Sequence, residues 1–93
     1  MTLNERVQEM HEEIRMMSST SVERHELMTI FHNGYDEHWN KFGSYRNLRG
    51  EEYMEAMAGR YEWMFERTKT YKQQKDLLYQ KEKLAFPEDD SYE

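Results

Sequence analysis

The segment from Glu51 to Phe86 constrains the fold of this chain more than any other. Its apolar and semi-apolar residues recur at alternating spacings of three and four, which is the period of an α-helix and not of a strand. The periodic positions are Met54, Met57, Tyr61, Met64, Thr68, Tyr71, Leu78 and Ala85. Glu51 and Glu52 suit the positive end of a helix dipole, and Pro87 marks the far end. We therefore predict one helix over residues 51–86.

A helix of this length restricts the architecture. At about 1.5 Å per residue it would be roughly 54 Å long. A compact chain of 93 residues has a radius of gyration of only about 12–13 Å. The helix must therefore project beyond a monomeric core or pack against a second copy, and we predict a homodimer that completes a helical bundle or coiled coil. Residues 72–76 are polar on every face, but no glycine or proline forces a kink there, so we expect a continuous helix with a solvated middle.

Composition indicates an all-α protein. Hydrophobic residues make up 37% and charged residues 34%, while 14% aromatic residues and eight methionines supply the surface that a core must bury. The chain has no alternating run of Val, Ile and Thr. The absence of cysteine excludes a disulfide scaffold and a thiolate metal site. No apolar window reaches the length of a membrane span or a signal sequence, so we expect a soluble, cytoplasmic protein with no membrane contact.

Two shorter helices are predicted before the long one. Thr2 and Glu5 form a capping box, and apolar residues then recur from Leu3 to Met17 at helical spacing, which predicts a helix over residues 3–17. Residues 18–21 are a polar break. Thr20 and Glu23 form a second capping box, which predicts a helix over residues 22–42. A short turn between two helices usually makes them antiparallel neighbours.

Gly34 leaves two interpretations of the second helix open. Glycine in a helix interior costs about 1 kcal/mol relative to alanine, so the helix could end at residues 32–34. The apolar spacing is unbroken on both sides of Gly34, however, and we favour a helix that continues to Gly43. Residues 1–86 then form a single helical domain, with a linker over 44–50. The acidic residues 87–93 are expected to be a disordered tail.

The sequence predicts no catalytic residue, cofactor or metal site. No nucleophile elbow, phosphate-binding glycine loop or Cys/His pair occurs. His32 and Asp36 lie one helical turn apart and could share a metal ion, but His25 is about 10 Å further along the helix axis. Two ligands do not make a site, so we interpret these side chains as polar residues beside an apolar face.

Two acidic clusters suggest one enzymatic hypothesis. They consist of Glu9, Glu12 and Glu13, and of Glu51, Glu52 and Glu55. The pattern resembles the paired Glu-x-x-Glu elements of all-helical nucleotide pyrophosphatases of the MazG type, in which carboxylates gather around magnesium. The resemblance implies a small magnesium-dependent nucleotide pyrophosphatase. The second cluster lacks the downstream aspartate of that family, and the dipole of the long helix already explains Glu51 and Glu52.

A basic segment over residues 67–83 suggests a nucleic-acid-binding regulator as an alternative function. Its cations are Arg67, Lys69, Lys72, Lys75, Lys81 and Lys83. Tyr71 and Tyr79 lie between them, and Arg46 and Arg49 in the linker could extend a phosphate-binding stripe. The net charge of −6 and the absence of a helix-turn-helix signature oppose this hypothesis.

The main functional hypothesis is a small non-catalytic interaction module that binds a macromolecular partner stoichiometrically and inhibits or regulates it. Tyrosine, tryptophan, methionine and arginine are enriched where proteins bind proteins, and this chain has more of them than its apolar stripes can bury. In composition it resembles the host-directed inhibitors of bacteriophages that act on defence nucleases or on transcription. The candidate partner-binding residues are Tyr45, Arg46, Arg49, Tyr53, Trp63, Arg67, Lys72 and Lys75.

Overall fold

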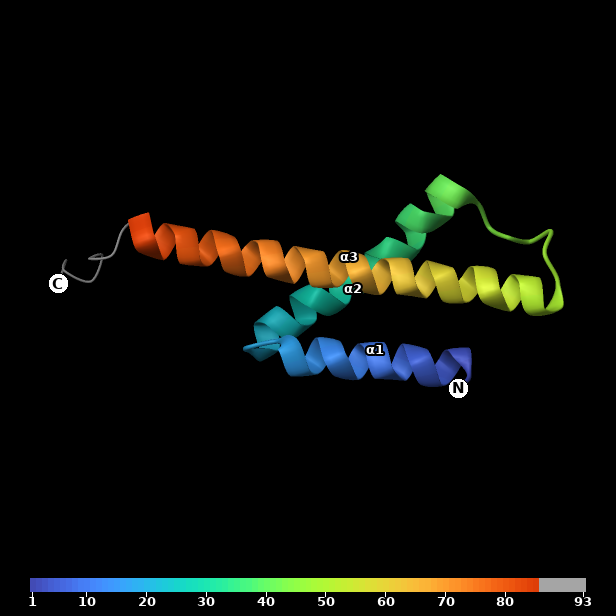
Figure 1. Ribbon diagram of the computed structural model, residues 1–93, viewed down its shortest axis with the longest axis horizontal. Helices are drawn as coiled ribbons and strands as arrows, with labels where there is room; N and C mark the ends of the chain where they lie inside the picture. The colour runs from blue at the N-terminus through green and yellow to red at the C-terminus, as the bar shows by residue number, and fades with distance from the viewer. Residues whose placement is uncertain (86–93) are drawn as a thin grey trace.

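The computed structural model describes residues 1–85, with side chains through residue 82. Within that range it contains three helices, α1 (Leu3–Met17), α2 (Ser21–Phe42) and α3 (Gly50–Ala85), and no strand. α1 and α3 run in the same direction, whereas α2 runs in the opposite direction and crosses α3 (Figure 1). The predicted all-α fold of two shorter helices and one long helix is confirmed. The predicted acidic tail over 87–93 lies outside the described residues.

Of the two predicted capping boxes, the structure contains one in full and the other only in part. The box at α1 is confirmed, because the Thr2 hydroxyl accepts from the Glu5 amide at 3.2 Å and the Glu5 carboxylate accepts from the Thr2 amide at 2.9 Å. At α2 the Thr20 hydroxyl accepts from the Glu23 amide at 3.0 Å. The second half of that box was predicted wrongly, since the Glu23 carboxylate accepts from the Ser19 amide at 2.6 Å instead. This carboxylate also faces the lysines of α3, which draws it away from the cap.

All three helices contribute to one core. The fully buried side chains at its centre are Met10, Ile14, Leu27, Phe31, Met64 and Phe65. They come from one stripe of each helix, because positions three and four apart share a helix face. Phe31 lies at the crossing of α2 with α3, where it contacts the Tyr61 ring at 6.3 Å between centroids. The core is therefore placed where the helices cross and not along the whole of α3.

α2 continues through Gly34, as favoured from the apolar spacing. Gly34 is buried against α3. A Cβ atom built at this position would lie 3.1 Å from both the Met64 Cγ and the Arg67 Nη1 atoms. The missing side chain thus allows α2 and α3 to approach closely at their crossing, which outweighs the low helix propensity of glycine.

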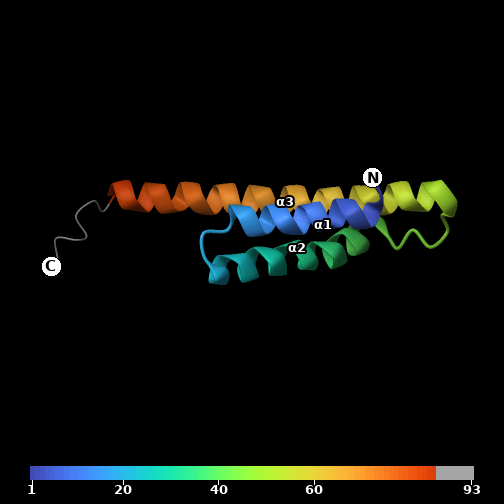
Figure 2. The same ribbon diagram turned by 90° about the horizontal axis from the view of Figure 1, so that it is seen from below.

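α3 is continuous over residues 72–76, but its predicted solvated middle needs a correction. The Lys72 side chain is only 13% exposed, because it pairs with Glu23 of α2. Beyond this point α3 extends past the ends of both other helices (Figure 2). Leu77 and Leu78 of this projecting end are 65% and 57% exposed. The radius of gyration of 17.4 Å accordingly exceeds the roughly 12–13 Å expected for a compact chain of this length.

Candidate functional site

The predicted partner-binding lysines of α3 are engaged within the chain. Lys72 Nζ lies 2.9 Å from the Glu23 carboxylate, and Lys75 Nζ lies 2.6 Å from Glu26 and 3.3 Å from Glu23. The Tyr71 hydroxyl donates a hydrogen bond to Glu26. The amide of Ser19 and the Lys72 ammonium group lower the pKa of Glu23 to about 2. These contacts join the start of α2 to the middle of α3 and leave little of Lys72 available to a partner.

Arg67 and Trp63 occupy the crossing of α2 and α3. Arg67 donates to the Ile30 carbonyl at 2.9 Å and to the Glu37 carboxylate at 2.6 Å. Its guanidinium lies 5.9 Å from the centre of the Trp63 ring. Trp63 is half-buried and meets the His38 ring edge-on at 5.2 Å. The part of Trp63 that remains accessible lines a shallow groove of about 370 Å³ together with residues of α2.

A buried arginine organises the other end of the α2–α3 contact. Arg60 is fully buried, its Nε atom donates to His38 Nδ1 at 3.2 Å, and its Nη2 atom donates to the Gly43 carbonyl. Its guanidinium stacks on the rings of Tyr45 and Tyr35 at 4.6 and 4.8 Å. Burial and the nearby Arg60 charge lower the pKa of His38, so the imidazole stays neutral and can accept this hydrogen bond.

The exposed members of the candidate set, Arg46, Arg49 and Tyr53, lie in the linker before α3 and in its first turns, beside the half-buried Tyr45. Tyr45 adopts a left-handed backbone conformation with φ of 62° and turns its ring onto Arg60. Arg46 is exposed, and Arg49 donates to the carbonyls of Arg46 and Leu48 at 2.6 and 2.9 Å. Tyr53 in the first turns of α3 is 37% exposed.

The candidate residues therefore do not form one site. Along α3 the axial distance from Tyr53 to Lys72 is roughly 28 Å at about 1.5 Å per residue. The structure brings Tyr45, Arg46, Arg49 and Tyr53 to the end at which α3 begins. Arg67, Lys72 and Lys75 lie in ion pairs with α2. Three of the six cations of the predicted basic stripe are thus already neutralised by α2, which weakens the case for phosphate binding.

Histidine contacts link α1 to α2. The ring of His11 meets Phe31 and His32 edge-on, at 5.5 Å between centroids in both cases. Its Nε2 atom is buried and has no hydrogen-bond partner in the described part of the chain. The pKa of His11 is lowered mainly by burial and, to a smaller extent, by the charge of the neighbouring His32. Residues 1–85 contain no group of three or more His, Cys, Asp or Glu side chains placed to hold a metal ion.

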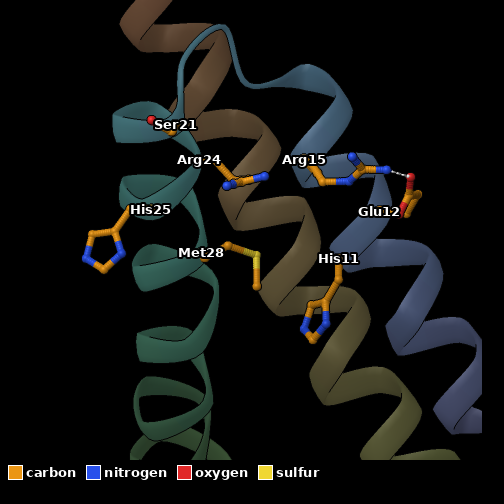
Figure 3. A pocket seen from close by; sticks show the side chains of 7 residues that line it. All are labelled: His11, Glu12, Arg15, Ser21, Arg24, His25 and Met28. Atoms are coloured by element: carbon orange, nitrogen blue, oxygen red, sulfur yellow. Dashed lines mark hydrogen bonds and ion pairs between the residues drawn. The ribbon is translucent and has the colours of Figure 1, made fainter.

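The acidic clusters are not gathered around a common centre. Glu9 pairs with Arg6 at 3.0 Å, and Glu12 pairs with Arg15 on the same helix. Figure 3 shows this second pair at the rim of a groove of about 420 Å³ between α1 and α2, where Arg15 turns toward Glu12 and Arg24 of α2 extends toward α1. The Glu-x-x-Glu pattern of α1 is therefore part of ordinary helix-surface ion pairing.

Comparison with known proteins assigns this chain to no family. No protein-family model, curated protein or solved structure matches the chain. None of the helices in residues 1–85 combines the length and apolar character that a membrane span needs.

Sequence reasoning missed the contacts that two residues make between helices. Arg60 follows Met57 by three positions and precedes Met64 by four, so its spacing placed it on the buried stripe of α3 although its charge suggested exposure. For Glu23, the only local signal was its distance of three residues from Thr20. Its role as the partner of two lysines in α3 depends on the crossing of the helices, which no local pattern encodes.

Glu23 gives a pH-dependent prediction. Glu23→Gln is expected to destabilise the protein by about 2 kcal/mol near neutral pH, because it removes a nearly buried charge from its lysines. The pKa of Glu23 is lowered from 4.5 to about 2. Its ionised form therefore adds stability above pH 4.5 that is lost as the pH falls toward 2. Urea denaturation over this range should show the difference between wild type and variant shrinking.

The control for this measurement is Glu66→Gln. Glu66 is exposed, and its one ion-pair partner among the described residues is Lys69 one turn away, at 2.9 Å. Its replacement should change the unfolding free energy by about 0.5 kcal/mol or less. A difference between wild type and Glu23→Gln that stays constant with pH would contradict the assignment of this charge to the α2–α3 contact.

Proposed function

We propose that this protein is a non-catalytic interaction module that acts as a homodimer and binds a macromolecular partner stoichiometrically, to inhibit or regulate it. The observation that carries the proposal is the uncovered end of α3. Leu78 at this end is 57% exposed, so the described residues leave more than half of its side chain uncovered. Burial of that surface against a second chain would be favourable.

The core-facing stripe of α3 continues into this end. A spacing of seven residues returns to nearly the same face of a helix. Leu78 therefore lies on the same face of α3 as Tyr71, which packs against the core. Tyr79 likewise lies on the same face as Lys72, which pairs with α2. Leu78 thus has the position of a core residue, but it is 57% exposed, and this end of α3 extends past the ends of α1 and α2 (Figure 2).

The same face is complementary to itself in an antiparallel pair of α3 ends. When Leu78 of one copy faces Tyr79 of the other, Lys75 faces Glu82 and Asp76 faces Lys81. Both polar pairs join opposite charges, which add to the pairs that Lys75 makes with Glu26 and Asp76 makes with Lys72 within one chain. The apolar pair lies between them. The overlap is short, and interfaces smaller than the standard size are weak and transient. We therefore expect a dimer that forms with rising protein concentration.

Sedimentation velocity over a range of protein concentrations tests the dimer. Leu78→Glu places a charge in the middle of the contact and should weaken association by about tenfold or more, a change of about 1.4 kcal/mol. Leu77→Glu is the matched control, because Leu77 is exposed to a similar extent, 65% against 57%, but faces away from this stripe. Circular dichroism checks that both variants stay helical. Equal association of wild type and Leu78→Glu would refute the dimer contact, as would equal weakening by both variants.

Affinity capture tests the binding of a partner. The resemblance to bacteriophage products makes a bacterial lysate the first source, with and without nuclease treatment. A single protein captured in both samples, which then forms a complex of fixed ratio with the purified chain, is the expected result. Capture of nuclease-sensitive material alone would overturn the proposal in favour of nucleic acid.

A further inference from the structure

A groove separates the start of α1 from the first turns of α3. It exists because α3 begins at Gly50, several residues before it meets α1, so that neither α1 nor α2 covers its first turns on this side (Figure 2). Its volume is about 620 Å³. The residues that line it are Met1, Thr2, Leu3, Arg6, Glu51, Met54, Glu55 and Ala58. It does not overlap the proposed dimer contact at the other end of α3.

The floor of this groove is apolar and adaptable. Met54 is 48% exposed, and Leu3 and Ala58 are half-buried beside it. Methionine is unbranched and fits irregular apolar shapes, which is why binding surfaces that accept helices often contain it. An apolar residue of a partner, inserted between Leu3 and Met54, would be shielded from water and would shield both of these side chains as well.

The rim of the groove is negatively charged. Glu51 and Glu55 are exposed, and neither makes an ion pair with another described residue. Arg6 is the one cationic side chain in the lining, and its charge is already matched: it lies 2.6 and 3.0 Å from the Glu62 carboxylate and 3.0 Å from Glu9. The groove therefore offers two unmatched carboxylates beside an apolar floor.

We propose that this groove receives an amphipathic helix of the protein partner, with an apolar residue on Met54 and lysine or arginine beside Glu51 and Glu55. α1 and α3 run in the same direction along the groove, and a third helix laid between them would continue the bundle. The unmatched carboxylates select a basic segment and repel anionic surfaces. This inference rests on the proposed function and specifies the class of segment that the partner presents.

Fluorescence anisotropy with a synthetic probe tests the groove directly. The probe is a labelled peptide of leucine and lysine at helical spacing, and the reference peptide has glutamate in place of lysine. We expect the lysine peptide to bind, to bind less tightly as salt is added, and the glutamate peptide not to bind. Met54→Glu should weaken binding of the lysine peptide by about tenfold or more, and Glu55→Lys by a similar factor.

Glu51 and Glu52 provide a matched pair of control positions. Both are exposed residues in the first turn of α3, but only Glu51 lines the groove. Glu51→Lys should weaken binding of the lysine peptide by about tenfold, whereas Glu52→Lys should change it by about twofold or less, because exposed charges further from the peptide are screened by solvent and salt. Equal effects of the two changes would show non-specific attraction and overturn the inference.

The remaining outcomes separate this inference from the proposed function. Loss of self-association in Met54→Glu would assign the groove to a second copy of this chain and overturn the inference. Capture of the same lysate protein by wild type and Met54→Glu would also overturn it, while leaving the proposed function intact. A wild-type chain that binds the lysine peptide but captures no protein would contradict the proposed function alone.

Discussion

Replacement of Arg60 by alanine is expected to lower the free energy of unfolding by about 3–5 kcal/mol. The side chain is fully buried, and its loss would leave the Gly43 carbonyl and His38 Nδ1 without their donor. It would also leave a cavity between the rings of Tyr35 and Tyr45. Because Gly43 ends α2, the connection to α3 would loosen with it.

Urea denaturation followed by circular dichroism measures this effect. Arg60→Lys keeps the charge but cannot reach His38 and Gly43 with separate nitrogen atoms, so its loss of stability should be smaller but still about 2 kcal/mol. Arg46→Ala removes an exposed arginine from the adjacent linker and should cost about 0.5 kcal/mol or less. If Arg60→Ala proved no more destabilising than Arg46→Ala, the buried guanidinium would not hold this end of the bundle together.

Gly34→Leu should have the second largest effect, a loss of about 2–3 kcal/mol. A Cβ atom at this position already lies 3.1 Å from Met64 Cγ, and Met64 is itself buried. A leucine side chain would force α2 and α3 apart at the crossing that contains the core. Gly34→Ala should be close to neutral, because a gain in helix propensity of about 1 kcal/mol offsets the tight contact.

Gly59 provides the matched glycine for this experiment. It lies inside α3, and a Cβ atom there would meet nothing within 4 Å. Gly59→Leu should therefore raise the unfolding free energy by about 0.5–1 kcal/mol, through helix propensity alone. Thermal unfolding of the variants distinguishes packing from propensity. Similar stability changes in Gly34→Leu and Gly59→Leu would contradict a close approach of the helices at Gly34.

The helices could be predicted from the sequence because their signals are local. Thr2 and Glu5 are close enough in the chain for the capping box to be read directly, and the structure contains both of its hydrogen bonds. The apolar spacing across Gly34 likewise predicted a continuous α2. In the same way, the absence of glycine and proline from residues 72–76 predicted a continuous α3.

The partners of polar side chains could not be predicted in this way. Considered on α3 alone, Lys72 belongs to a segment that is polar on every face, which suggests a solvated position. The crossing of α2 brings Glu23 to within 2.9 Å of it, although the two residues are 49 positions apart in the chain. The choice of candidate partner-binding residues depended on which side chains are exposed. Arg46, Arg49 and Tyr53 are accessible, whereas Lys72 is largely covered.

The position of the core has a consequence for synthesis. α1 and α2 supply Met10, Ile14, Leu27 and Phe31, but Met64 and Phe65, which complete the cluster, belong to the last helix. A nascent chain that ends after α2 therefore has nothing to cover these apolar side chains. At about 5–20 residues per second, roughly twenty more residues take on the order of 1–4 s to add. The ribosome must release the first half of α3 before this protein can close its core.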